Sequence, residues 1–427
     1  MVLLLIGYFF LYIERPWEVW PRLAPYRIER VYMLLAMGVF ALWRGKRLRW
    51  GAHPLLVATF LGLHYAFAPF AFSPRAALDQ GFEYLKMAVS YFLIIWSVRD
   101  EAELRTLVHG YAGVMGLYLL HSFREYLAGR HWYRMGIVRM VGVGQFANDP
   151  NAFAASIAFS LPFVLLVLRT DNRRWAKAAC IAYGGLALYC IVLTGSRAGF
   201  VTLALFGLLV IGQAGGRRMV SALVAALILA SIGWEVMPED KKLRIETIWN
   251  PEAGPAGAQA SAEGRIEGLK AGLRIMARRP LTGAGPGGEN FMRYRAALDD
   301  GSATQAHNLF GEVLGEMGLL GGFVFLAQVA AAWVMAGKAR ILLSSAPTAN
   351  LVFLDRLAIA CRQGLALMLF NGLFGHNLYR ANWLWIGAWS FLAHRFQEDR
   401  AHEVQPSRLH EMRRAAVPSS ATRAGRS

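Results

Sequence analysis

Charged residues are scarce in this sequence. They make up 17% of its 427 residues, while hydrophobic residues make up 56%, and soluble domains usually carry about 25% charged residues. The apolar residues also come in blocks of about 17–25, the length that crosses the core of a bilayer as a helix. The low charge therefore excludes an ordinary soluble domain and predicts an all-α, polytopic integral membrane protein.

Cysteines and metal-binding acidic pairs are equally scarce. Cys180, Cys190 and Cys361 all lie in apolar blocks, and their spacing fits neither a disulfide framework nor a zinc site. No DxD-type pair stands outside the apolar blocks, because Asp299 and Asp300 are adjacent and are predicted to form a solvent-exposed turn. We therefore expect buried cysteines that act as small apolar side chains, no bound metal and no cofactor.

The charge that is present is strongly positive, with a formal net value of +17. In a soluble protein this value would indicate nucleic-acid binding, but here the basic residues lie mostly in short loops between apolar blocks. The loops at 43–50, 169–177 and 215–218 and the Arg-rich tail after Phe396 fall on one face of the predicted topology. The positive-inside rule makes that face cytoplasmic, so we expect no nucleic-acid partner.

Twelve transmembrane helices are predicted. Helices 1–9 fall in residues 1–237, a large periplasmic loop occupies 238–307, helices 10–12 fall in 308–396, and 397–427 form a disordered cytoplasmic tail. The first block has neither a basic n-region nor a small-residue cleavage site, which favours a retained helix over a signal peptide. The predicted spans are 2–13, 28–43, 53–72, 82–98, 104–125, 150–168, 175–194, 197–214, 218–237, 308–336, 350–373 and 378–395.

Two loops on the opposite face carry unexpected basic residues. The 124–149 loop holds four arginines, among them Arg139, and arginines on the face that the charge rule disfavours indicate anion binding. In the large loop, Ser261 is expected to cap a basic amphipathic helix that runs to Arg279 and carries Arg265 and Arg274. Such a helix lies on a membrane surface or against the membrane domain. Most of its charges could serve either to attract lipid headgroups or to bind a substrate, and the sequence leaves both alternatives open.

The stretch QAHNLFGEVLGEMGLLGG (305–322) opens the tenth predicted span. Glu312 and Glu316 are four residues apart on one helix face, where they are expected to pair with arginine or to face a watery cavity. Another face of the helix carries Gly311, Gly315, Gly318 and Gly322. This small-residue face predicts close backbone packing against a neighbouring helix.

His307 and Asn308 come directly before this helix, at the external membrane boundary. A histidine there reaches both water and a lipid headgroup. It can take up or hold a proton near neutral pH, which suits a general base.

Other polar stretches are predicted to meet on the same external face. TGSRAGF places Arg197 at the mouth of the eighth span, where it needs a carboxylate or a phosphate as partner. GQFANDPNAFAAS places Asp149 as the cap of the sixth span, followed by Pro150, and leaves Asn151 able to face a substrate. The last external turn, FGHNLYRAN, adds residues without a predicted direct role: His376, Asn377 and Arg380.

Together these features resemble the O-antigen ligase and polymerase superfamily of bacterial envelope glycosyltransferases. The ligase signature is a His, then Asn, Ser or Gln, nine residues, Gly, two residues, and Gly, Thr or Tyr. His307, Asn308, Gly318 and Gly321 fit this signature completely. TGSRAGF looks like the family's Ser-Arg-Gly-type element, and Arg265 stands where the family carries a second functional arginine.

The resemblance implies a GT-C-like, metal-independent transferase in the bacterial inner membrane, with both termini cytoplasmic and the site facing the periplasm. The donor would be a glycan on undecaprenyl diphosphate, and the acceptor a sugar hydroxyl on lipid A–core. His307 would be catalytic, and Arg197 and Arg265 would bind the diphosphate. Supporting roles fall to Asn308, Glu312, Glu316, Arg139, Asn151 and Arg274.

Other functions stay open from the sequence. An O-antigen polymerase or a protein O-glycosylation enzyme would use the same class of donor, and the complete histidine signature favours the ligase over the polymerase. A transporter or flippase is a more distant alternative, because transporters tend to place ionisable groups at the membrane midplane in repeated halves. Here the polar residues gather on one external face, and the two halves of the chain do not match.

Overall fold

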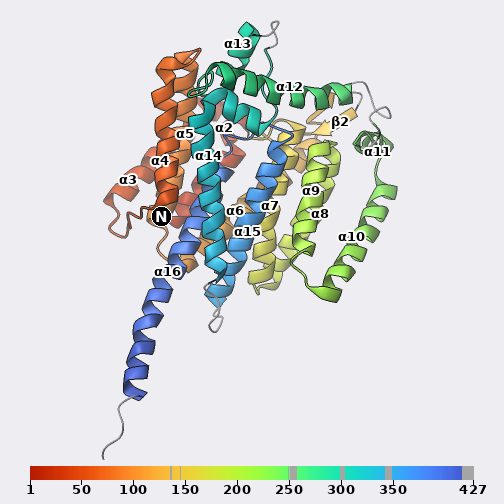
Figure 1. The fold of residues 1–427 in the computed structure, drawn as a ribbon. Helices are drawn as coiled ribbons and strands as arrows, with labels where there is room; N and C mark the ends of the chain where they lie inside the picture. The colour runs from red at the N-terminus through yellow and green to blue at the C-terminus, as the bar shows by residue number, and fades with distance from the viewer. Residues whose placement is uncertain are drawn as a thin grey trace, which may run out of the picture.

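The computed structural model describes residues 1–134, 137–144, 146–248, 250, 257–298, 303–341 and 349–415. The chain is 79% helical and all-α, apart from one antiparallel hairpin that pairs His131 with Met140. Figure 1 shows a bundle of roughly parallel helices with α12 lying across one end. Asp299 and Asp300, predicted to form a turn, lie outside the described residues.

The elements follow one another with short connections. They are α1 (Val2–Glu14), α2 (Pro16–Val19), η1 (Pro21–Tyr26), α3 (Ile28–Leu42), α4 (Ala52–Phe67), η2 (Ala68–Phe70), α5 (Pro74–Ser97), α6 (Glu101–Leu127), β1 (His131–Arg134), β2 (Ile137–Met140), α7 (Pro150–Thr170), α8 (Arg174–Thr194), α9 (Arg197–Ile211), α10 (Gly216–Val236), α11 (Glu239–Glu246), α12 (Gly257–Arg278), α13 (Gly288–Leu298), α14 (Leu309–Ile341), α15 (Ala349–Gly372) and α16 (Asn382–Ala415).

Each predicted apolar block coincides with a helix. By length and composition, three helices within the described residues could cross a membrane: α7, α8 and the Leu309–Ala339 part of α14. Helix α9 is apolar but shorter. The structure therefore supports a helical membrane protein, and the count of twelve spans stays a prediction.

Aromatic side chains fill the centre of the bundle. The ring of Trp385 on α16 lies 4.5 Å from that of Phe9 on α1, and Trp389 lies 4.7 Å from Phe163 on α7. Both tryptophans are 1% exposed. Because these large rings pack in edge-on or tilted contacts, they join helices that are far apart in sequence into one core.

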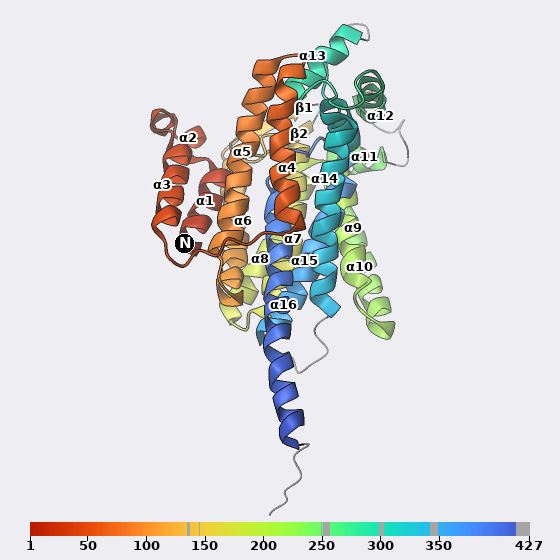
Figure 2. The same ribbon diagram turned by 60° about the vertical axis from the view of Figure 1, so that its left-hand side comes forward.

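The glycines of α14 pack against α12. A Cβ on Gly311 would lie 2.8 Å from the carbonyl oxygen of Gly268, and one on Gly315 would lie 3.0 Å from the Cα of Gly272. The two backbones therefore touch with no room for side chains, as in small-residue helix crossings in membranes. The predicted close packing of Gly311 and Gly315 is confirmed, and their partner is the helix that crosses the end of the bundle (Figures 1 and 2).

The prediction of one uninterrupted helix over 308–336 is wrong at Gly318. This residue has φ 62° and ψ −163°, so it breaks α14. The loop after α12 bonds to the broken turn: Leu319 N–H donates to the Pro280 carbonyl at 2.7 Å, and Ala284 N–H donates to the Gly315 carbonyl at 2.7 Å. A break in an apolar helix needs such partners, because unpaired backbone groups are costly away from water. Gly322 contacts only side chains of its own helix.

Two predicted boundaries also differ. Ser261 lies inside α12 rather than at its start, since that helix begins at Gly257. Helix α16 continues to Ala415 and extends away from the bundle (Figure 2), although residues 397–427 are predicted to be disordered. Charge pairs of the kind that stabilise helices, such as Arg395 with Glu398 at 3.2 Å, favour this continuation. Residues 416–427 lie outside the described part of the chain.

We predict that Gly272→Ala destabilises the protein by about 1–3 kcal/mol, because the added methyl group would collide with the backbone of Gly311. Gly184→Ala on α8 is the matched control, since a Cβ there meets nothing within 4 Å, and alanine is the better helix former. Thermal unfolding of the purified protein in detergent measures both variants. Equal unfolding temperatures for Gly272→Ala and the wild type would contradict the tight crossing.

Candidate functional site

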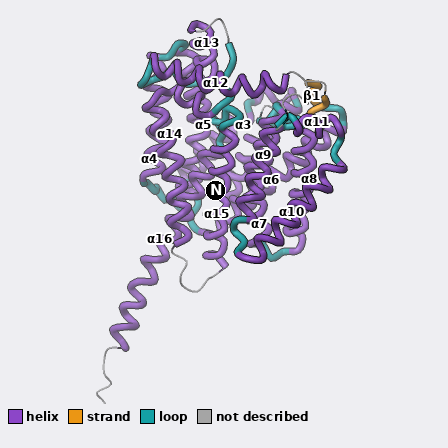
Figure 3. Tube along the Cα trace, turned by 45° about the vertical axis from the view of Figure 1, so that its right-hand side comes forward, coloured by secondary structure: helices purple, strands orange, loops and turns teal. Residues whose placement is uncertain are grey.

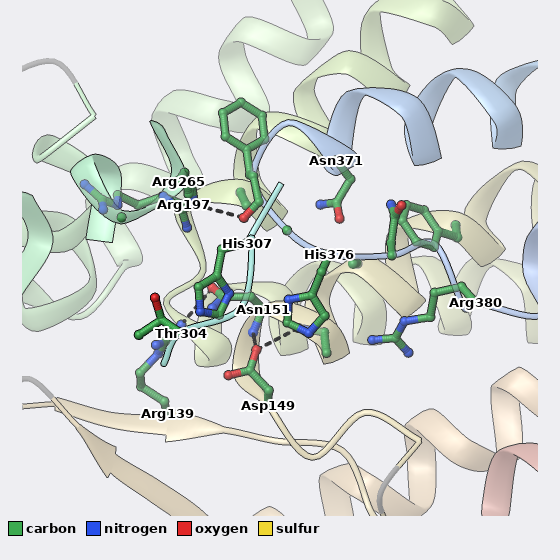
Figure 4. A pocket seen from close by; sticks show the side chains of 18 of the residues that line it. Arg139, Asp149, Asn151, Arg197, Arg265, Thr304, His307, Asn371, His376 and Arg380 are labelled. Atoms are coloured by element: carbon green, nitrogen blue, oxygen red, sulfur yellow. Dashed lines mark hydrogen bonds between the residues drawn. The ribbon is translucent and has the colours of Figure 1, made fainter. Parts of the chain in front are cut away.

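A cavity of about 470 Å³ lies at the end of the bundle that α12 crosses. Helix α7, the first turn of α9, the middle of α12, the segment that precedes the cap of α14 and the turn between α15 and α16 all contribute to its wall. Figure 4 shows the side chains converging on one space from these elements. The described lining residues are Arg139, Asp149, Asn151, Ala152, Ala155, Phe159, Arg197, Ala198, Arg244, Gly264, Arg265, Thr304, His307, Asn371, Phe374, Gly375, His376, Asn377 and Arg380.

His307 enters the cavity from an unusual backbone conformation. Its φ is 47°, in the left-handed region that few non-glycine residues occupy. The next residue, Asn308, caps α14: its Oδ1 accepts hydrogen bonds from the N–H groups of Phe310 at 3.0 Å and Gly311 at 3.1 Å. His307 therefore holds a strained backbone conformation directly before the cap of α14, and its side chain is exposed at the cavity.

Arg197 and Arg265 lie beside each other on one side of the cavity (Figure 4). Arg197 is the first residue of α9, and its Nη1 donates to the Thr247 hydroxyl at 3.2 Å. Arg265 donates from Nε to the Phe374 carbonyl at 2.8 Å. Burial and then the charge of Arg197 lower the pKa of the Arg265 guanidinium. Two cations held this close favour an anion between them.

Arg139 is 2% exposed and supports the turn that carries Arg197. Its Nε donates to the Thr194 carbonyl at 2.7 Å, and its Nη2 donates to Asn151 Oδ1 at 3.2 Å. Asn151 also accepts a bond from the Ser196 hydroxyl at 2.8 Å. Arg139 and Asn151 thus both line the cavity, and their bonds also fix the α8–α9 turn.

Arg244 was not predicted from the sequence. It donates from Nε to the Gly195 carbonyl at 2.7 Å and is 6% exposed. Nearby, Lys241 donates to the Val138 carbonyl of β2. Figure 3 shows the hairpin and α11 at the same end of the molecule as α12. The hairpin and α11 therefore place buried cations behind Arg197. These contacts join segments that are distant in sequence, so no local motif predicts them.

The α15–α16 turn contributes side chains to the cavity for which the sequence predicted no direct role. The rings of His307 and His376 have centroids 5.2 Å apart. Burial, the neighbouring His307 and Arg380 lower the pKa of His376 to about 4, and Asp149 opposes this shift. His376 is therefore neutral at physiological pH, with its ring open to the cavity.

The other predicted residues lie elsewhere. Glu312 and Glu316 are 5% and 1% exposed and lie behind the cavity wall. Glu312 accepts from the Leu378 N–H at 3.1 Å, while Glu316 accepts from the Tyr379 hydroxyl at 2.6 Å and from the Gly287 N–H at 2.7 Å. The alternative of an arginine partner is not what the structure shows, since both carboxylates fix loops instead.

Arg274 is exposed on α12 and does not line the cavity. Asn308 does not line it either, and its side chain caps α14.

The cavity is strongly cationic. Five arginines and two histidines line it, and Asp149 is the one acidic residue among the described lining residues. Asp149 is also occupied as the cap of α7, accepting from the N–H groups of Asn151 at 2.8 Å and Ala152 at 3.0 Å, as predicted. Across the described chain, no three His, Cys, Asp or Glu side chains are grouped as metal ligands. The wall is therefore suited to an anionic ligand.

An all-helical chain with membrane-length apolar helices is typical of a membrane protein, and the cationic cavity at one end of its bundle is suited to an anionic ligand. Residues 182–326 match the family model described as O-antigen ligase, so this part of the chain is similar to that family. The matched segment contains Arg197, Arg265 and His307. No curated protein matches the chain.

We predict that His376 makes the stability of the protein depend on pH between about 6.5 and 4. Because its pKa is lower in the folded state, the unfolded chain binds the proton first, and stability falls as pH decreases through this range. His376→Gln removes this term, so its unfolding temperature declines less steeply with acid than that of the wild type. The surface variant His131→Gln is the control. Identical slopes for His376→Gln and the wild type would contradict the lowered pKa of the His376 imidazole.

Proposed function

We propose that this protein is a glycosyltransferase of the O-antigen ligase type. It would transfer a glycan from undecaprenyl diphosphate to a hydroxyl group of an acceptor, namely a sugar of lipid A–core. The observation that carries this proposal is the convergence of His307, Arg197 and Arg265, from distant parts of the chain, on one cationic cavity. The family match supports a transferase acting on lipid-linked glycans.

The chemistry assigns a role to each of these side chains. The acceptor oxygen attacks the anomeric carbon of the donor glycan, and its proton passes to His307. The bond between that carbon and the diphosphate oxygen breaks, and undecaprenyl diphosphate leaves with the electron pair. Arg197 and Arg265 stabilise the charge that develops on the leaving diphosphate, so in this proposal two guanidinium groups do what a divalent metal does in other transferases.

The proposed topology follows from the end of the bundle at which the basic connections lie. The α7–α8 and α9–α10 connections, which carry basic residues, lie opposite α12 and the cavity (Figure 1). The positive-inside rule then makes the end with the cavity periplasmic. In this arrangement twelve helices span the inner membrane, residues 238–307 form the periplasmic loop, and both termini are cytoplasmic.

The product distinguishes the ligase from its relatives. Purified protein would be incubated in EDTA with an undecaprenyl-diphosphate glycan and lipid A–core. We expect the glycan to move in one step onto lipid A–core. A ladder of longer glycans still on the carrier would identify a polymerase, and no transfer to either acceptor would contradict the proposal.

We predict that His307→Ala and Arg197→Ala each reduce the transfer rate by at least about a hundredfold, because they remove the base and a charge on the leaving group. Arg274→Ala removes an exposed arginine outside the cavity and serves as the control with wild-type activity. Initial rates of glycan transfer, with equal unfolding temperatures as a check on folding, measure all three. Wild-type rates in either cavity variant would refute the assignment of the site.

A further inference from the structure

A second cavity of about 270 Å³ adjoins the first. His376, Asn377 and Arg380 line both spaces, so the turn between α15 and α16 forms the partition between them. Tyr379 of the same turn also lines the second cavity. The rest of the second wall comes from the end of α1, the loop before α7 and the first turn of α14, and these residues are Tyr12, Arg15, Phe146 and Glu312.

The two walls differ in chemistry. Among the described lining residues, the first wall has five arginines and two phenyl rings, Phe159 and Phe374. The second wall is smaller and richer in aromatic rings, with Tyr12, Phe146 and Tyr379. Its polar residues are Arg15, Glu312, His376, Asn377 and Arg380. Aromatic faces suit the C–H faces of a sugar ring, and a few placed polar groups suit its hydroxyls. The first wall therefore fits a diphosphate, and the second fits a saccharide.

The second wall is held open by its own contacts. The ring of Tyr12 packs 5.4 Å from Trp385 and 6.1 Å from Phe146. Arg380 donates to the Phe146 carbonyl at 2.8 Å and lies over the Phe146 ring at 5.8 Å. Because these side chains are fixed before any ligand arrives, binding would require little ordering of the wall.

Arg15 reaches the second cavity from a chain reversal. Its φ of 49° ends α1 and begins α2, and its guanidinium is held by Glu18 at 2.9 Å. The ion pair with Glu18 orients the guanidinium of Arg15. It therefore presents fixed N–H donors of the kind that bind sugar hydroxyls or an anionic sugar substituent.

We propose that the second cavity binds the saccharide of the acceptor and that its reacting hydroxyl reaches His307 past His376. The 5.2 Å between the two imidazole rings joins the sugar cavity to the cavity that holds the donor diphosphate. This inference rests on the proposed function, and it assigns the two substrates to two sides of one partition. Specificity for the acceptor then depends on α1 and the loop before α7, which lie outside the segment that the family model matches.

Sugar binding without donor tests this assignment. A deacylated core oligosaccharide and an oligosaccharide of the donor's repeating unit would each be titrated into purified protein by calorimetry. We expect wild-type protein to bind the core oligosaccharide, and Tyr12→Ala and Arg15→Gln to weaken that binding by about tenfold or more. Binding of the donor oligosaccharide alone would contradict the assignment to the lipid A–core acceptor. Tyr26→Ala and Arg22→Gln are the matched controls, since both side chains are exposed and stand outside the two walls. Undecaprenyl diphosphate should bind all four variants as it binds the wild type.

The possible outcomes distinguish the proposal of an acceptor cavity from the proposed transferase function. Unchanged sugar affinity in Tyr12→Ala and Arg15→Gln, or no sugar binding by the wild type, would overturn the acceptor cavity. Sugar binding that these two variants lose, with no glycan transfer from any lipid-linked donor, would support the cavity and defeat the proposed function. Unfolding temperatures of the variants exclude a general loss of folding as the cause.

Discussion

The contact between the glycines of α12 and α14 fixes the rest of the site. Gly268 and Gly272 meet Gly311 and Gly315 backbone to backbone, and neither helix can shift along the other without a collision. Arg265 stands three residues before the first of these glycines on α12, and His307 stands four residues before the first on α14. One register of packing therefore sets the positions of Arg265 and His307, which are 42 residues apart in sequence.

The electrostatics of the cavity depend on how its cations are held. Arg139, Arg244 and Arg265 all donate to backbone carbonyls. A carbonyl orients a guanidinium but leaves its full charge in place, whereas a carboxylate would cancel it. The five arginines that line the cavity therefore give its wall a strongly positive character. Such a wall is suited to an anionic ligand.

Local motifs were enough to predict part of this site. Arg197 follows Ser196, which caps α9 by accepting from the Gly199 N–H at 3.1 Å, and His307 precedes the cap of α14, so both positions follow from short-range rules. Arg244 could not be predicted in the same way, because it reaches the cavity only through contacts between distant segments. His376 and Arg380 were predicted to lie on the same external face, but the local sequence did not show that they line the cavity. The break at Gly318 was hidden because a left-handed glycine and a packing glycine look alike in sequence. Glu312 and Glu316 were placed on one helix face correctly, but the loops that they bind depend on tertiary structure.

The central claim is that Arg197, Arg265 and His307 act on one lipid diphosphate. The most direct measurement is an electron cryo-microscopy structure of the protein in nanodiscs with bound undecaprenyl diphosphate. We predict diphosphate density between the two guanidinium groups, within reach of the His307 ring and on the first side of the His376 partition. A diphosphate bound elsewhere on the bundle, with this cavity empty, would contradict the account.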